Sequence, residues 1–222
     1  SAKKSVIQIF PEITRELFPQ KNDLTEFGMH YQEGYYRVEM RRVIIHDILP
    51  EDVEVDKDDV LIAMYLFDET ELRRYIQENK DQKLVSALIY IDNYEEALEG
   101  VEEVRRPLLT ALVDRKINKY FQNIDAIVKK LEKDKYFVVL RKSGYKRIKE
   151  DKFSLLEEVK QVNIGNARSA TLSIGLGLNT ATYALSYQYA RVAIDLALAR
   201  GGDQAVIKDC NGITYFGGKK EQ

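Results

Sequence analysis

Residues 187–208, YQYARVAIDLALARGGDQAVIK, decide the fold of this chain. Apolar side chains recur at helical spacing through this stretch and the residues just before it, at Leu185, Tyr189, Val192, Leu196 and Ala199. We therefore expect a helix over 182–199 and a short buried strand over 204–207. An apolar run at 170–178 precedes the helix and is typical of a strand. Together these segments predict a strand–helix–strand unit in a layered fold.

Gly201 and Gly202 follow the predicted helix directly. Glycine is the usual residue just beyond a helix C-terminus because it adopts a left-handed backbone without strain. Arg200 also suits the negative end of the helix dipole. A glycine pair can instead let a phosphate approach the backbone. We favour the cap, because this pair ends a helix rather than joining two strands.

Upstream of this unit the pattern predicts further alternating elements. Pro107 is suited to the first turn of a helix, and the polar stretch 132–135 separates two apolar strands as in a hairpin. The expected elements are a strand at 84–91, helices at 94–104 and 107–124, strands at 126–131 and 136–141, and a helix at 150–162. This order predicts an α/β (α+β) fold in which helices flank a sheet.

The first third of the chain predicts a smaller unit. Residues 1–29 carry the loose pattern of a short amphipathic helix, with Pro11 suited to a helix start. Strands are expected at 34–45 and 60–67. A helix is expected at 68–79, where either Asp68 or Thr70 can cap its start. An acidic stretch at 51–59 lies between the strands. A calcium loop would need a turn glycine, and none occurs from 47 to 80. We expect a solvated connector there.

Composition excludes several functions. The 34 basic and 36 acidic side chains nearly balance among 222 residues, which excludes a strongly basic nucleic-acid binder. One cysteine cannot form a disulfide framework or a zinc site with several thiolates. That residue, Cys210, precedes a turn dipeptide, Asn211-Gly212, and is expected on an edge strand. No run approaches the 18 apolar residues of a membrane span, so we expect a soluble segment. No histidine follows His46, which excludes a Cys-His or Ser-His-Asp arrangement in the later part of the chain.

The order of elements and the segment Thr171–Gly175 resemble the GGDEF domains of nucleotide cyclases. The run at 187–208 resembles the end of the degenerate GGDEF domain in cyclic di-AMP phosphodiesterases of the GdpP/YybT type. The resemblance implies a ferredoxin-like βααββαβ sheet in a bacterial membrane-anchored protein that continues into a DHH/DHHA1 phosphodiesterase. Tyr215–Lys219 resembles the start of the linker to that domain.

The strands before Asp68 and the segment Asp68–Glu71 resemble the last strands of a PAS domain and the motif that begins its output helix. The resemblance divides the chain into a partial PAS-like sensor domain at 1–67, a connector helix at 68–83 and a degenerate GGDEF domain at 84–222. It implies a cytoplasmic segment that forms a homodimer and relays PAS sensing to the phosphodiesterase domain. We expect the opening strands of a complete PAS domain to be missing, since such a domain needs about 100 residues and 67 precede Asp68.

The signature hairpin of the family is matched by Lys133–Phe137, where lysine and aspartate replace both glycines, and Lys135 and Tyr136 replace the acidic pair. Tyr90 stands at the usual metal-ligand position of the first strand, and Leu98 replaces an amide that pairs with guanine. Cyclisation of a nucleoside triphosphate needs carboxylates that hold divalent cations. We therefore expect no diguanylate cyclase activity.

Asp92 is the remaining carboxylate we nominate for magnesium, bound with ATP, while Lys133, Lys135, Arg141 and Lys142 are candidates for phosphate contacts. The alternative is a solvated hairpin whose lysines only keep it soluble. The resemblance also suggests heme at an intact PAS domain, and His30 and His46 are the available axial ligands. Besides the regulatory role, slow magnesium-dependent ATP hydrolysis at Asp92 and a pure dimerisation scaffold remain as alternatives.

Overall fold

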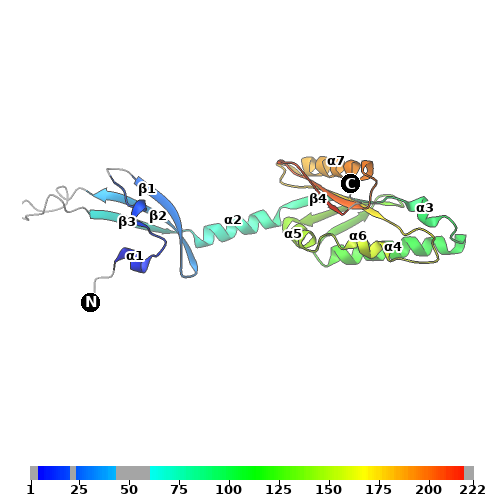
Figure 1. Ribbon diagram of the computed structural model, residues 1–222, viewed down its shortest axis with the longest axis horizontal. Coiled ribbons are helices and arrows are strands. Elements are labelled where there is room, and N and C mark those ends of the chain that lie inside the picture. Colours follow the sequence, from blue (N-terminus) through cyan, green and yellow to red (C-terminus); the bar gives the residue numbers. More distant parts are fainter. Residues whose placement is uncertain (1–4, 21–23, 44–60, 218–222) are drawn as a thin grey trace, which may run out of the picture. The chain divides into compact units, whose positions relative to one another are not determined.

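The computed structural model describes residues 5–20, 24–43 and 61–217 (Figure 1). The chain divides into two compact units, residues 1–78 and 79–222. Within the described ranges, no helix is both long and apolar enough to cross a membrane.

The first unit is built on a three-stranded antiparallel sheet, in the order β1 (Leu24–Tyr31), β2 (Gly34–Val43) and β3 (Leu61–Asp68). Its core includes four fully or nearly fully buried residues, Ile13, Met29, Val38 and Met40. The segment that supplies Ile13 also carries a single helical turn, α1 (Val6–Ile9), and a short 3₁₀ helix (Arg15–Leu17). This hydrophobic contact fastens the N-terminal segment to one face of the sheet.

Two expectations for the first 31 residues are wrong. Pro11 lies in a turn after α1 instead of starting a helix, and the strand β1 was not predicted. The signal for β1 is an alternation of Thr25, Phe27, Met29 and Tyr31 with more polar residues or glycine, which is the period of a strand with one buried face. The acidic stretch 51–59 and His46 lie outside the described residues.

The helix after β3, α2 (Thr70–Gln82), begins as the sequence predicts. The Asp68 carboxylate accepts the backbone N–H of Thr70 at 2.9 Å. Side-chain hydrogen bonding with Thr70, followed by this backbone contact, lowers the pKa of Asp68. The Thr70 hydroxyl in turn accepts the backbone N–H of Tyr35 at 2.9 Å. The start of the helix is thereby tied to β2.

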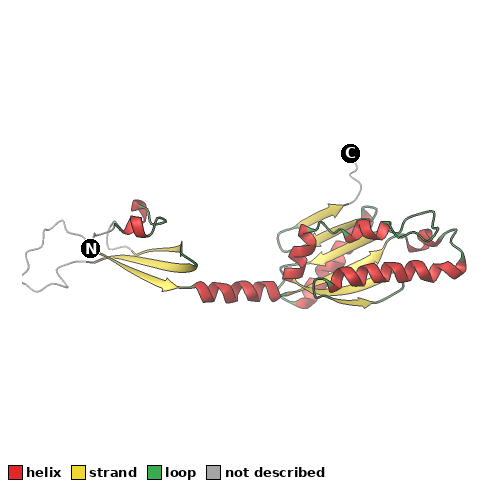
Figure 2. Cartoon of the chain, turned by 90° about the horizontal axis from the view of Figure 1, so that it is seen from below, coloured by secondary structure: helices red, strands yellow, loops and turns green. Residues whose placement is uncertain are grey.

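The second unit is a six-stranded sheet (Figure 2). Its strand order is β5-β6-β4-β7-β8-β9, and the strands are β4 (Leu84–Ile91), β5 (Ile127–Lys130), β6 (Lys135–Arg141), β7 (Leu172–Gly177), β8 (Gln204–Lys208) and β9 (Ile213–Gly217). β7 and β8 are parallel, and the other neighbours are antiparallel. A helix, α7 (Tyr183–Ala199), crosses over between the parallel pair, which confirms the predicted strand–helix–strand unit.

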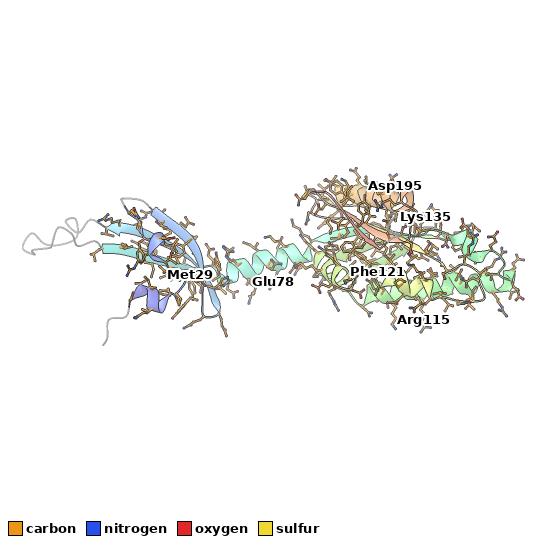
Figure 3. The ribbon with its side chains drawn as sticks, viewed as in Figure 1. Met29, Glu78, Arg115, Phe121, Lys135 and Asp195 are labelled. Carbon is orange, nitrogen blue, oxygen red and sulfur yellow. The ribbon has the colours of Figure 1, made fainter. Side chains whose placement is uncertain are left out.

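Helices cover both faces of this sheet (Figure 1). The main core lies on the face opposite α7 and includes Phe121, labelled in Figure 3, and Leu109. The helices on that face are α3 (Tyr94–Leu98), α4 (Arg106–Gln122), α5 (Lys142–Glu150) and α6 (Leu155–Lys160). The predicted α/β class with helices flanking a sheet is therefore confirmed.

α7 lies unusually close to the sheet because β7 carries glycines where it crosses. A Cβ built on Gly177 would lie 1.9 Å from the backbone oxygen of Ser186, and one on Gly175 would lie 2.4 Å from the nitrogen of Ile194. Because α7 lies so close, the Ser186 hydroxyl reaches both strands. It donates to the Gly177 carbonyl at 2.8 Å and accepts the N–H of Ser86 at 3.0 Å. A buried serine thus joins α7 to β7 and β4.

The glycine pair after α7 is a helix cap, as predicted. The N–H of Gly201 donates to the Leu198 carbonyl at 3.0 Å, and that of Gly202 donates to the Ala197 carbonyl at 2.9 Å. Both glycines have positive φ, +93° and +73°. This pair of hydrogen bonds is the Schellman arrangement that ends a helix.

Three boundaries differ from expectation. The helix predicted at 94–104 ends at Leu98, and the one predicted at 150–162 begins only at Leu155, as α6. α5, which ends at Glu150, was not predicted, and in the turn between α5 and α6 Lys152 and Phe153 have positive φ. Tyr215–Gly217 belong to β9, which pairs with β8, so these residues are not the start of a linker. Phe216 explains why, because its ring packs at 5.1 Å from that of the buried Phe153.

Candidate functional site

The turn between β5 and β6 is the position at which the sequence predicts the signature hairpin. The N–H of Leu131 donates to the Lys135 carbonyl at 2.9 Å, which closes the hairpin. Lys135 pairs with Tyr90 across to β4, so the hairpin lies beside the end of the central strand. The structure confirms that Lys133–Phe137 occupy the bend and the strand that follows it.

Tyr136 is buried at the acidic position of the signature. It is 1% exposed, and its hydroxyl donates to the carboxylate of Asp114 on α4. Lys130 Nζ contacts both oxygens of Asp114 at 2.9 Å. Burial, followed by the Asp114 carboxylate, raises the pKa of Tyr136, so the phenol stays protonated. Tyr136, Asp114 and Lys130 form a closed, mutually satisfied set.

Tyr90, which the resemblance sets at the other metal-ligand position, lies on the sheet face that α7 covers. Its ring packs against the small cluster of Leu88, Ala190 and Ile194, and burial raises the pKa of its hydroxyl. Lys135 Nζ lies 5.5 Å from the centre of the ring. Figure 3 labels Lys135 and, on α7, Asp195. A protonated phenol beside a lysine cannot replace the carboxylate that magnesium requires.

Three of the four basic residues predicted to contact phosphate are paired with carboxylates, and the fourth, Lys142, contacts the Asn179 amide oxygen at 2.7 Å. Lys133 forms an ion pair with Glu95 that raises the pKa of the lysine, Lys135 pairs with Glu132 at 2.8 Å, and Arg141 pairs with Asp125 at 3.4 Å. The hairpin therefore carries little uncompensated positive charge.

Arg141 is also far from the hairpin. β6 has 7 residues and begins at Lys135, so Arg141 lies about 20 Å along the strand from it. The structure does not bring Arg141 together with Lys133 and Lys135, although it does bring those two lysines to one turn. The sequence placed all three in one basic stretch because they are close in number, whereas an extended strand separates its ends.

Asp92 points into the protein. Its Oδ2 accepts the N–H of Asp203 at 2.8 Å, and its Oδ1 is buried without a hydrogen-bond partner. A Cβ on Gly202 would lie 2.6 Å from Oδ2, so the glycine that caps α7 also makes room for this carboxylate. Burial raises the pKa of Asp92. Asp92 thus fastens the end of β4 to the loop that enters β8.

This geometry does not fit the magnesium site predicted at Asp92. The carboxylate of the neighbouring Asp203 forms an ion pair with Lys160 at 2.7 Å. No group of three or more His, Cys, Asp or Glu side chains that could hold a metal ion occurs among the residues that the structure describes. The contacts of Asp92 therefore do not support a metal-dependent reaction at this residue.

We expect Asp92→Asn to leave the fold intact and to be at least as stable as the natural chain at pH 7, because its amide oxygen still accepts the Asp203 N–H and no charge is buried. Asp92→Ala should lose about 1–3 kcal/mol of unfolding free energy, since that N–H is left unpaired. Urea unfolding measures both. Equal losses in the two variants would contradict a hydrogen-bonding role.

The contribution of Asp92 to the free energy of unfolding changes with pH in a predictable direction. The raised pKa of Asp92 means that the folded protein holds this proton more tightly than the unfolded chain does. The contribution of Asp92 to stability therefore falls as the pH rises from about 3.9, the unfolded value, through the raised folded pKa. Asp92→Asn should remove this part of the slope from a urea series over that range.

The heme ligand predicted at His30 gains no support from its position. His30 is exposed on β1, and its ring packs edge-on against Tyr35 with 4.9 Å between the ring centres. An axial ligand lies inside the pocket that encloses the heme. The heme binding suggested by the resemblance stays a prediction, and His46 lies outside the described residues.

Comparison with known proteins gives a consistent family. The profile described as "Cyclic-di-AMP phosphodiesterase GdpP-like, GGDEF domain" matches residues 89–214. The cyclic-di-AMP phosphodiesterase GdpP of Geobacillus thermodenitrificans is 32% identical over 157 residues, 70% of this chain and 24% of that protein. GdpP of Bacillus subtilis is 30% identical over 168 residues, 75% of this chain and 25% of that protein. The chain therefore spans about a quarter of the length of these relatives.

The fold matches as well. The X-ray structure of a diguanylate cyclase/phosphodiesterase from Caldicellulosiruptor saccharolyticus has a TM-score of 0.50 at 14% identity, and the match covers 66% of this chain and 90% of that one. At this identity the likeness concerns the fold alone.

Proposed function

Because this chain belongs to the family of GGDEF domains of GdpP-like cyclic-di-AMP phosphodiesterases, we propose that it is a regulatory segment whose GGDEF domain is catalytically degenerate. Its role is to relay the state of a PAS-like sensor to a DHH/DHHA1 phosphodiesterase domain of the same protein. In this proposal the chain is the cytoplasmic part of a membrane-anchored homodimer.

The observation that carries the degenerate state is the occupation of both metal-ligand positions by tyrosine. Tyr136 is buried and hydrogen-bonded to Asp114, and Tyr90 is held against the α7 cluster. Neither phenol supplies an ionised oxygen at neutral pH, since burial raises the pKa of both. A cyclase must hold cations that position the phosphates and offset developing charge. The site offers no such ligands at these two positions.

The relay role is supported by the connector and its anchorage. Arg37 of β2 contacts Glu69 at 2.9 Å just before α2, and the guanidinium of Arg73 lies 3.5 Å above the ring of Tyr35. At the other end, Asp81 pairs with Lys146 of α5 at 2.6 Å. A helix fastened at both ends can transmit a change in packing, provided that a ligand favours one of two arrangements.

The experiment that tests this role uses the parent protein with and without residues 84–208. We expect deletion to abolish the response of cyclic di-AMP hydrolysis to ligands of the sensor, while hydrolysis itself continues. Hydrolysis and its ligand response are measured by product release. An unchanged response in the deleted protein would reject the relay.

Slow ATP hydrolysis by the chain itself remains the competing proposal, although no contact at Asp92 favours it. It requires magnesium-dependent phosphate release that disappears in Asp92→Asn, a variant that keeps the hydrogen bond to Asp203. A scaffold without ligands requires that the chain bind no nucleotide at all. A titration of the chain with ATP and magnesium, followed by calorimetry and phosphate release, separates these outcomes.

A further inference from the structure

A ligand-sized cavity of about 620 Å³ opens at the end of the sheet away from the hairpin. It lies within the second unit, between the end of α2, the start of β4 and the start of α7. Its lining comprises Lys80, Lys83, Leu84, Val85, Lys142, Asn179, Thr180, Ala181, Thr182 and Tyr183. Small-molecule pockets in proteins span roughly 300–1,000 Å³, so this volume suits a metabolite.

The charge of this lining has one sign. Three lysines line the cavity, and no aspartate or glutamate does. Lys142 Nζ contacts the Asn179 amide oxygen at 2.7 Å. Because an amide is neutral, this contact does not compensate the positive charge of Lys142. Lys80 and Lys83 form no ion pair with any residue in the described ranges. Two carboxylates outside the lining have other partners: Asp81 forms an ion pair with Lys146 at 2.6 Å, and Asp209 accepts a hydrogen bond from the Asn179 amide at 3.3 Å.

Two other groups of basic residues, at the hairpin and at a second cavity, each have carboxylates beside them. At the hairpin, Lys133 and Lys135 are neutralised by Glu95 and Glu132. A second cavity, of about 630 Å³, includes Arg115, Lys116 and Lys119, but Glu158 lies in its lining. The three lysines of the first cavity, Lys80, Lys83 and Lys142, instead converge from different elements, and the lining of that cavity contains no carboxylate.

We propose that this cavity binds the phosphate groups of a small polyphosphate-bearing molecule. Ammonium groups bind phosphate oxygens as point charges. The Thr182 hydroxyl accepts the Leu185 N–H and still has its own proton to donate to a phosphate oxygen. The start of α7, at Tyr183, adds the positive end of a helix dipole. Leu84, Val85 and the exposed ring of Tyr183, 66% accessible, supply an apolar wall for a base or other organic group.

Such a ligand would join three elements that are separate in the sequence. Lys80 belongs to the last turn of α2, Lys142 begins α5, and Thr182 caps α7 through its bond to the Leu185 N–H at 3.1 Å. A phosphate held by these residues would cross-link the connector to the domain that follows it. The proposal stands independently of the relay, since it needs only the chain described here.

Isothermal titration of the full chain with tripolyphosphate, and separately with ATP, in EDTA tests the proposal. Binding is expected without magnesium, and it should weaken as salt is raised because the contacts are ionic. The variant Lys80→Gln/Lys83→Gln/Lys142→Gln should lose affinity by at least about tenfold. If the base contributes, ATP binds more tightly than tripolyphosphate and Tyr183→Ala removes the difference; equal affinities assign binding to the phosphates alone.

Two control variants remove positive charge elsewhere, and the first removes the same number of charges. Arg115→Gln/Lys116→Gln/Lys119→Gln removes three positive charges at the second cavity, where Arg115 is labelled in Figure 3, and should keep its affinity. Lys133→Gln/Lys135→Gln removes charge at the hairpin and should also bind normally. Absence of binding to the natural chain, an equal loss in both triple variants, or a loss confined to the hairpin variant would overturn the proposal.

Folding is checked separately by circular dichroism. If the triple variant fails to fold, the single variants Lys80→Gln and Lys83→Gln decide, because both side chains are exposed and neither contributes an ion pair within the described ranges. Unchanged affinity in both single variants would then reject the site.

Discussion

Replacing Tyr136 by glutamate, the residue type that the family signature has at this position, is expected to destabilise the second unit by about 3–5 kcal/mol at pH 7. Tyr136 is 1% exposed and donates its hydroxyl to Asp114. A carboxylate there can only accept hydrogen bonds, and it would face a second carboxylate while leaving part of the space of the ring empty. Lys130, which already pairs with Asp114 at 2.9 Å, is one cation for two anions.

The dependence on pH distinguishes charge from lost volume. The new carboxyl group should have a raised pKa in the folded state, so the penalty should be largest at neutral pH and should shrink as the pH falls toward about 4.3, the unfolded value. Tyr136→Glu/Asp114→Asn should recover part of the loss because the like charge is gone. Urea unfolding at two pH values measures these differences.

Tyr136→Phe is the matched control, since it keeps the ring and removes only the hydroxyl. We expect it to cost about 1 kcal/mol, the usual net value of a hydrogen bond. A stable Tyr136→Glu variant at pH 7 would show that the pocket can hold a carboxylate, and it would remove the main support for a degenerate site.

Gly177→Ala is expected to cost about 3 kcal/mol or more. The added Cβ would lie 1.9 Å from the Ser186 oxygen and 2.9 Å from the Ala190 nitrogen, both of which are backbone atoms of α7. A side chain can rotate away from a clash, but helix backbone cannot. α7 would have to withdraw from β7, which breaks the bonds of the Ser186 hydroxyl to Gly177 and Ser86.

The control is Gly144→Ala in α5. Its Cβ would meet the Ile124 oxygen at 3.2 Å, a tight contact that a shift of a few tenths of an ångström relieves. Alanine also favours the helix by about 1 kcal/mol over glycine, so the net change should be small. Thermal or urea unfolding gives both values, and similar losses in the two variants would contradict the close approach of α7 as the cause.

Periodicity was sufficient to predict most elements of the second unit. The apolar spacing of α7 and the strand runs at 84–91 and 170–178 are local signals, because each element buries one face or is buried on both. The glycine cap after α7 was predictable for the same reason, since it depends on the chain beside it. α5 was missed because Gly144 and five charged residues dilute the helical pattern of Tyr145 and Ile148.

The candidate site was predictable only in part. The replacement of acidic residues by Tyr90 and Tyr136 is visible in the sequence, and so is the hairpin that carries Lys133. Asp114 has no local signal as the partner of Tyr136, because it lies 22 residues away on a helix. The ion pair of Lys133 with Glu95 and the contact of Asp92 with Asp203 likewise join distant segments.

The sequence by itself determined most elements of the second unit, the glycine cap that ends α7, and the tyrosines that stand where the resemblance expects carboxylates, because those properties depend on side-chain type and on neighbours a few residues away. Tertiary structure alone decided which charges remain free. Lys133, Lys135 and Arg141 meet carboxylates supplied by other segments or by the adjoining turn, whereas Lys80, Lys83 and Lys142 converge on a cavity that no carboxylate lines. Electrostatic compensation depends on distances in space, which the folded chain sets and the order of residues does not.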